Sequence, residues 1–127
     1  MTLMSFIPVN AKKKVRYLIN RHLLNIVIAP ERKTKRGDFR VYSNGEKKIT
    51  LNKDLNKYRF LITLLHEIAH QLVFEIFGNN IKPHGIEWKK NFKEISKPFL
   101  FESIFPQPIL DDLKKYLINP TSSTDLD

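Results

Sequence analysis

The chain contains the stretch Leu64-Leu65-His66-Glu67-Ile68-Ala69-His70, which has the pattern H-E-x-x-H. Around it, apolar residues recur at helical spacing from residue 60 to residue 76, and Gly78 then supplies a stop signal. We therefore expect a helix over residues 57–77, with Asn56 as its N-cap. Because this segment is the longest periodic one in the sequence, it should form the centre of the fold.

Residues four apart lie on the same face of a helix, so His66 and His70 can reach a single metal ion. Glu67 stands beside them and can take a proton from the water that attacks a substrate. The alternative is that both histidines are ordinary, partly buried residues of a core helix. That alternative leaves Glu67 unexplained, because an unpaired carboxylate seldom lies on an apolar helix.

A catalytic zinc site normally has three protein ligands, so a third ligand is expected. The metzincin pattern is excluded because Val73 and Ile76 stand where it needs glycine and histidine. His84, in a turn flanked by proline and glycine, is the favoured third ligand, since imidazole suits zinc. Glu87 is the rival ligand, whereas His22 follows a basic helix and is expected to be solvated.

The active-site stretch together with His84-Gly85-Ile86-Glu87-Trp88 resembles the SprT-like metalloprotease family. Residues 36–40 and 49–52 resemble the strands that precede its active-site helix, and the resemblance covers about residues 8 to 118. It implies that His66, His70 and His84 bind Zn²⁺, that Glu67 is the catalytic acid and base, and that the substrates are proteins bound or crosslinked to DNA. Many members carry a cysteine-rich zinc ribbon after this domain, but this chain has no cysteine.

Charge is unevenly distributed along the 127 residues. Residues 1–59 hold 15 Lys and Arg against 4 Asp and Glu, a balance of +11, while residues 60–127 hold 7 against 9. Such asymmetry indicates a polyanionic partner such as nucleic acid, and the resemblance implies that this partner is DNA. The candidate nucleic-acid-binding residues form two clusters, which are Lys12, Lys13, Lys14 and Arg16, and Arg32, Lys33, Lys35 and Arg36. The alternative is that these basic residues only form solvent-exposed surfaces and bind no partner.

Composition predicts a soluble, cytoplasmic protein, which would be associated with the nucleoid in a bacterium. We expect it to be a monomer. Its 42% hydrophobic and 28% charged residues are typical of a globular domain, and no apolar run was expected to be long enough to span a membrane. The absence of cysteine fits the cytosol and excludes thiolate ligands, so a bound metal must use nitrogen and oxygen donors.

The remaining patterns predict an α+β, zincin-like fold in which a sheet of about three strands packs on the active-site helix. The expected strands are 25–29, 38–43 and 47–51, with a hairpin turn at Asn44-Gly45. Further helices are expected over 9–23, 85–96 and 108–118, and the aromatic stretch 99–105 should cover the core as a loop. Residues 1–118 should form one domain and residues 119–127 a flexible tail.

These inferences predict a zinc-dependent peptidase associated with DNA, in which an edge strand holds the substrate in an extended form. Trp88 should pack against the helix that carries His84. Three rivals are a nucleic-acid-binding module with a structural or vestigial zinc site, a zinc hydrolase that cleaves another kind of bond, and a metal-free helical interaction domain.

Overall fold

Four α-helices and three strands account for most of residues 2–122, the part of the chain that the computed structural model describes. In chain order they are α1 (Lys12–His22), β1 (Ile26–Ala29), β2 (Gly37–Val41), β3 (Lys47–Asn52), α2 (Lys57–Phe77), α3 (Ile86–Ser96) and α4 (Gln107–Ile118). Short 3-10 helices cover Leu3–Phe6, Val9–Ala11 and Lys97–Phe99. The α+β class and the three-stranded sheet are as the sequence predicts.

The sheet has the strand order β1-β3-β2, so β3 is central and β2 is an edge strand. β2 and β3 form the expected antiparallel hairpin, and β1 runs parallel to β3. Gly45 adopts a φ of 87° in the hairpin turn, a conformation that favours glycine, and its N–H donates to the carbonyl of Tyr42. The exposed edge of β2 is therefore available beside the helices.

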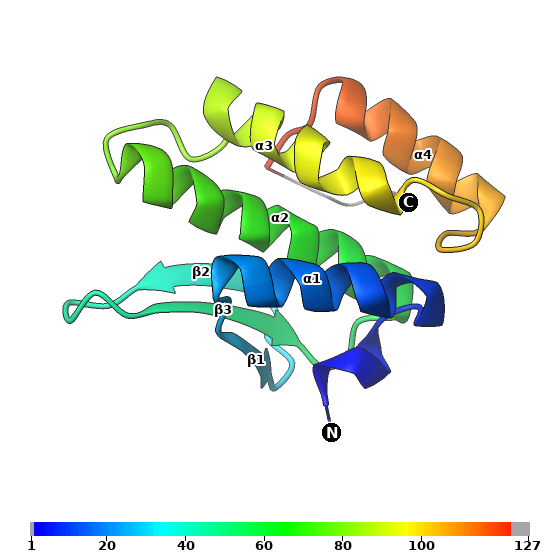
Figure 1. Cartoon of the computed structure of the whole chain (residues 1–127), viewed down its shortest axis with the longest axis horizontal. Coiled ribbons are helices and arrows are strands. Elements are labelled where there is room, and N and C mark those ends of the chain that lie inside the picture. Colours follow the sequence, from blue (N-terminus) through cyan, green and yellow to red (C-terminus); the bar gives the residue numbers. More distant parts are fainter. Residues whose placement is uncertain (1, 123–127) are drawn as a thin grey trace.

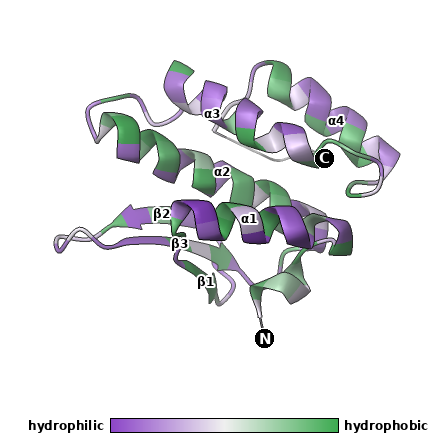
Figure 2. Cartoon of the chain, viewed as in Figure 1, coloured by the Kyte–Doolittle hydropathy of each residue, from purple (hydrophilic) through white to green (hydrophobic). Residues whose placement is uncertain are grey.

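Helix α2 lies between the sheet and α3, and it contacts β2, β3 and α3 (Figure 1). It begins where the Asn56 side chain accepts hydrogen bonds from the N–H groups of Tyr58 and Arg59, at 3.1 and 2.9 Å. Both sides of the helix are covered, which explains why it is apolar over so much of its circumference (Figure 2). Its bounds agree with the predicted helix.

The length and composition of α2 would suffice for a membrane span, which corrects the expectation that no segment qualifies. An 18-residue window of this helix is 67% buried inside the protein. The core helix of a folded domain meets the same two criteria, so this is weak evidence for a membrane.

The N-terminal segment is more structured than the sequence suggests. Residues Leu3–Phe6 form a 3-10 helix, and the Phe6 ring stacks on Phe60 of α2 at 5.2 Å. The helix expected over 9–23 starts as a 3-10 turn and is α-helical only from Lys12. Leu23 ends it in the left-handed conformation with a φ of 51°.

After α3 the chain passes through the aromatic stretch and returns along α4. Phe99, Ile104 and Phe105 are buried, as expected of a segment that covers the core, but Phe101 is 52% exposed. Residues 119–122, the described part of the predicted tail, follow α4. Pro120 is buried and Thr121 hydrogen-bonds to Tyr116, while the rest of the predicted tail lies outside the described residues.

Candidate metal centre

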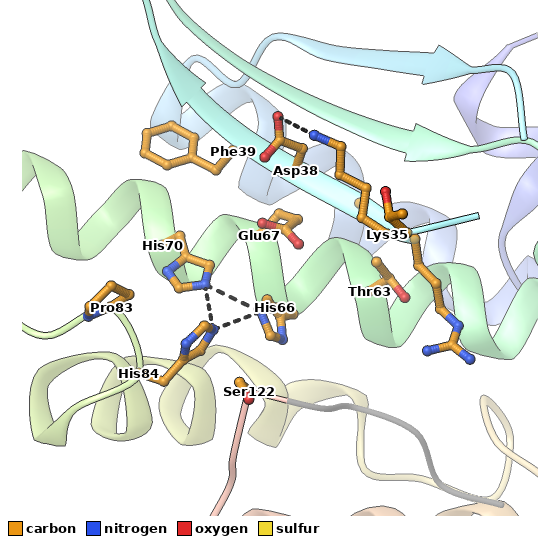
Figure 3. Close-up of a pocket in the computed structure, with 13 residues that line it drawn as sticks. Lys35, Asp38, Phe39, Thr63, His66, Glu67, His70, Pro83, His84 and Ser122 are labelled. Atoms are coloured by element: carbon orange, nitrogen blue, oxygen red, sulfur yellow. Dashed lines mark hydrogen bonds and ion pairs between the residues drawn. The ribbon is translucent and has the colours of Figure 1, made fainter. Parts of the chain in front are cut away.

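Three histidines converge beside the middle of α2. His66 and His70 come from adjacent turns of that helix, and His84 comes from the connection between α2 and α3. Their Nε2 atoms are separated by 3.2 Å (His66–His70), 3.1 Å (His70–His84) and 3.3 Å (His66–His84), as the dashed lines of Figure 3 mark. Among residues 2–122, they form the single group of potential metal ligands.

The histidine cluster fits a metal ion better than it fits mutual hydrogen bonding. A ring nitrogen carries either a proton or a lone pair, so three Nε2 atoms in a triangle cannot all be satisfied by one another. Zn–N bonds of about 2.0–2.1 Å in tetrahedral geometry place ligand nitrogens about 3.3–3.4 Å apart. The spacing in this protein is close to that value.

The protonation states of the histidines also suit coordination. Burial is the main cause that lowers the pKa of His66 to about 3 and that of His70 to about 4, and the charges of neighbouring histidines contribute to both shifts. Burial lowers the pKa of His84 too. The rings are therefore neutral at physiological pH, as metal ligands must be. The Nδ1 atom of His66 is buried without a hydrogen-bond partner among the described residues, so this ligand lacks the usual outer support.

His84 reaches the cluster because a tight turn precedes α3. The N–H of Gly85 donates to the carbonyl of Lys82 at 3.1 Å, and Gly85 is the N-cap of α3. Glu87, the rival ligand, lies in the first turn of α3 and is not part of the cluster. His22 lies at the end of α1, also away from it.

Trp88 is a packing residue, as expected, and in addition it contacts the rings of all three histidines. Its ring centroid lies 4.8 Å from that of His66, 5.5 Å from His70 and 4.7 Å from His84. The Trp88 side chain is fully buried, and its indole N–H donates to the His66 carbonyl at 3.3 Å. One large side chain thus restricts the orientation of every candidate ligand.

Glu67 is buried in the same cleft, with 7% of its surface exposed. Burial, with a smaller contribution from the negative charge of Asp38, raises the pKa of Glu67 to about 8, although Arg32 and Lys35 oppose the change. Asp38 itself pairs with Lys35 and Arg40, each at 3.4 Å. A carboxyl group in this environment can gain and lose a proton near neutral pH.

A cavity of about 530 Å³ lies above the histidines. Its walls include β2 residues Gly37, Asp38 and Phe39 on one side, and Pro83 and Ser122 elsewhere. In Figure 3, Asp38 and Phe39 lie on the opposite side of the histidines from Ser122. The edge strand therefore borders the candidate metal centre.

Gly37 allows β2 to lie this close to α2. A Cβ atom at this position would lie 2.8 Å from Thr63 Cγ2, 3.1 Å from Leu51 Cδ2 and 3.2 Å from Glu67 Oε2. Any larger residue must therefore displace buried side chains, including the carboxylate.

The second basic cluster forms part of the cavity wall. Arg32 donates from Nε to Asn52 Oδ1 at 2.7 Å and from Nη1 to Thr50 Oγ1 at 2.9 Å. Asn52 in turn donates from Nδ2 to the carbonyls of Arg32 and Lys35, at 3.1 and 2.7 Å. Arg32 thus holds the loop before β2 in place through its Nε and Nη1 atoms, while its Nη2 atom is buried without a hydrogen-bond partner among the described residues.

The other basic residues of that cluster differ in their surroundings. Lys35 pairs with Asp38 and lines the cavity together with Arg36, while Lys33 is exposed. In the first cluster, Lys13 and Arg16 are exposed on α1 and Lys12 is half-buried. Lys14 donates to the carbonyl of Pro98 and lies 4.5 Å above the Phe101 ring.

Residues 10–108 match the SprT-like family. The chain belongs to the SprT-like family. The matched region of this SprT-like chain runs from just before α1 into the start of α4, and it includes Glu67 and the three histidines. No curated protein matches the chain. Membership agrees with a metallopeptidase-like domain, and the three histidines could hold a metal ion.

Several residues of the site carry no sequence signal that identifies them. Gly37 is one of four glycines in the chain, and only the packing of β2 on α2 shows why it is needed. Asn52 and Ser122 are ordinary polar residues in the sequence, but Asn52 donates to the carbonyl of Lys35, a residue of the cleft wall, and Ser122 lines the cleft itself. The Trp88 contact with the histidines was predictable only in part, from its position one turn after His84.

Proposed function

We propose that this SprT-like chain is a zinc-dependent metallopeptidase, and that it acts on proteins associated with DNA. The observation that carries the first part is the presence of Glu67 in the same cleft as three neutral histidines with tetrahedral spacing. A bound zinc ion would polarise a peptide carbonyl and lower the pKa of water. Imidazole donors without thiolates are compatible with zinc.

The residues of the chain perform three tasks in this proposal. The three histidines hold the ion, and Trp88 fixes their rings. Glu67 accepts a proton at a carboxylate oxygen from the attacking water and delivers it to the leaving amine. A pKa raised towards neutrality suits a group that must do both.

The presence of an edge strand beside the histidines favours a polypeptide as the substrate over other hydrolysable molecules. β2 pairs only with β3 among the described strands, and Gly37, Asp38 and Phe39 line the cavity. An extended peptide can therefore add to β2 through main-chain hydrogen bonds, which carry little sequence preference. This favours a peptidase over a zinc hydrolase that cleaves a different bond.

Purified protein should degrade an unfolded protein substrate, lose this activity in a chelator, and recover it with Zn²⁺. A nucleic-acid-binding module with a vestigial metal site is the second candidate, and it predicts bound metal without turnover. Glu67 argues against it, because a purely structural site has no need for a buried carboxylate beside its ligands.

Association with DNA rests on α1. Lys13, Arg16 and Tyr17 are exposed on this helix, and a largely apolar groove of about 650 Å³ lies between α1 and the α3 region. Basic residues such as Lys13 and Arg21 line the groove. Cationic side chains around an apolar surface suit phosphates and stacked bases. We place the site here, since Arg32 and Lys35 of the other cluster are bound within the protein.

Charge reversal tests this placement. Lys13→Glu combined with Arg16→Glu should weaken binding of a single-stranded oligonucleotide and reduce the slope of log K against log salt by about 2. Lys33→Glu is the matched control from the other cluster and should have a smaller effect. Unchanged binding in the α1 variant, measured by fluorescence anisotropy at several salt concentrations, would reject the placement. Action beside DNA also implies the cytoplasmic location proposed for this chain.

A further inference from the structure

The segment Asn119–Ser122, which follows α4, borders the metal cleft. Ser122 lines the cavity that holds His66, Glu67 and His84. Together with Thr121 it also lines an adjoining cavity of about 920 Å³ around the turn that carries His84. The segment therefore lies at the junction of the two cavities. It also lies beyond residues 10–108, the region that matches the family.

This segment is held in place by two helices. The Tyr116 hydroxyl donates to the carbonyl of Thr121 and accepts from the Thr121 N–H at 3.1 Å. Lys89 of α3 donates to Asn119 Oδ1 at 2.8 Å, and Pro120 between these anchors is buried. These hydrogen bonds and the burial of Pro120 fix the backbone of residues 119–122, so the segment presents a defined surface.

The position of the segment opposite β2 gives the cleft two walls. Asp38 and Phe39 of β2 lie on one side of the histidines and Ser122 on the other (Figure 3). A polypeptide that pairs with the β2 edge and crosses the histidines must then pass the Asn119–Ser122 segment. A helix, with a diameter of about 10 Å including side chains, cannot pair with a strand edge, whereas an extended chain can.

We infer that Asn119–Ser122 is the second wall of the substrate cleft and that Tyr116 is the positioning residue that holds it. The substrate is then an extended polypeptide long enough to contact both walls. This inference rests on the proposed peptidase function. It adds to that function a substrate class and a residue from outside the matched region.

Tyr116→Phe is the variant that tests this wall. It removes the hydroxyl that binds Thr121 and keeps the ring, which packs edge-on against Phe92 at 6.1 Å. Tyr58→Phe is the matched control, because Tyr58 is half-buried and does not line the cleft. Two unstructured peptides are compared, of about 4 and about 10 residues; at about 3.3 Å per residue the longer reaches about 33 Å and makes the larger contact with the walls.

Tyr116→Phe should raise KM for the longer peptide by about threefold to tenfold, the effect of one or two lost hydrogen bonds. The kcat for that peptide, both constants for the shorter peptide, and the zinc content should stay within about twofold of wild type. Tyr58→Phe should change none of these. An unchanged KM for the longer peptide, or an equal rise for both peptides, would overturn the assignment.

A binding measurement separates this inference from the proposed chemistry. Zinc-loaded Glu67→Gln protein, with and without Tyr116→Phe, is titrated with both labelled peptides by fluorescence anisotropy. If Tyr116→Phe weakens binding of the longer peptide and leaves binding of the shorter peptide unchanged, residues 119–122 are supported as the second wall. This holds even if wild type cleaves neither peptide and the peptidase proposal fails. If the protein binds neither peptide, the assignment of residues 119–122 as a wall of the substrate cleft is overturned.

Discussion

Gly37→Ala tests how closely the edge strand must approach the active-site carboxylate. The added methyl group would lie 2.8 Å from Thr63 Cγ2 and 3.2 Å from Glu67 Oε2. Thr63 is 3% exposed and Glu67 is 7% exposed, so neither side chain has room to move outwards. The strand or the carboxylate must therefore shift by a few tenths of an ångström.

The expected loss of stability follows from overpacking a buried site, which costs about 1–3 kcal/mol. For a domain of this size, each kcal/mol lowers Tm by about 3–5 °C, so Tm should fall by about 3–15 °C. Peptidase activity measured well below Tm should fall by at least about tenfold, because small misplacements of reacting groups slow catalysis strongly.

Gly45→Ala provides a control of comparable stability. Gly45 has a φ of 87° with no atom within 4 Å of its Cβ position, so alanine there costs about 1 kcal/mol in backbone strain alone. This variant should lower Tm and keep wild-type activity. The reasoning is refuted if Gly37→Ala keeps both Tm and activity, or if Gly45→Ala loses as much activity as Gly37→Ala does.

Three further changes test other parts of the site. His84→Ala should reduce zinc affinity by more than about a hundredfold in a competition titration, whereas Glu87→Ala should leave it unchanged; the reverse result would identify Glu87 as the ligand. Asn52→Ala removes the anchor of Arg32 and of the loop before β2, so the free energy of unfolding in urea should fall by about 2–3 kcal/mol; a fall below about 0.5 kcal/mol would show that the anchor is dispensable. The metal-free protein should become less stable as pH falls from about 6.5 towards 4, because His66 and His70, with a pKa of about 3 and about 4, stay neutral when folded and gain protons when unfolded. Glu67, with its raised pKa, opposes this loss, but it is one group against two. Unfolding midpoints in chelator that do not fall between pH 7 and pH 5 would contradict this expectation.

Local signals predicted much of this fold. The period of apolar residues and the Asn56 cap located α2, and Asn44-Gly45 located the hairpin, because both elements depend on contacts between neighbours in sequence. The convergence of His66 and His70 followed from helix geometry alone. His84 could be proposed as a ligand, but only the folded turn before α3 brings it within 3.1–3.3 Å of the others.

The remaining features depend on contacts between distant parts of the chain. The parallel pairing of β1 with β3 places β2 at the edge, and no local pattern determines that order. Arg32 looks like a nucleic-acid contact in a basic run, but its Nε donates to the side chain of Asn52, twenty residues later. The anchored segment after α4 reads as a polar tail because the hydroxyl of Tyr116 that holds it gives no sequence signal.

The most direct test of the central claim compares wild type with Glu67→Gln for zinc content and for cleavage of an unfolded protein. The amide keeps the shape of the side chain but cannot accept a proton, so both proteins should bind about one zinc per chain and fold alike. Cleavage by the variant should fall by about a hundredfold or more. Cleavage by Glu67→Gln at the wild-type rate, or a wild-type protein that binds no zinc, would contradict the account.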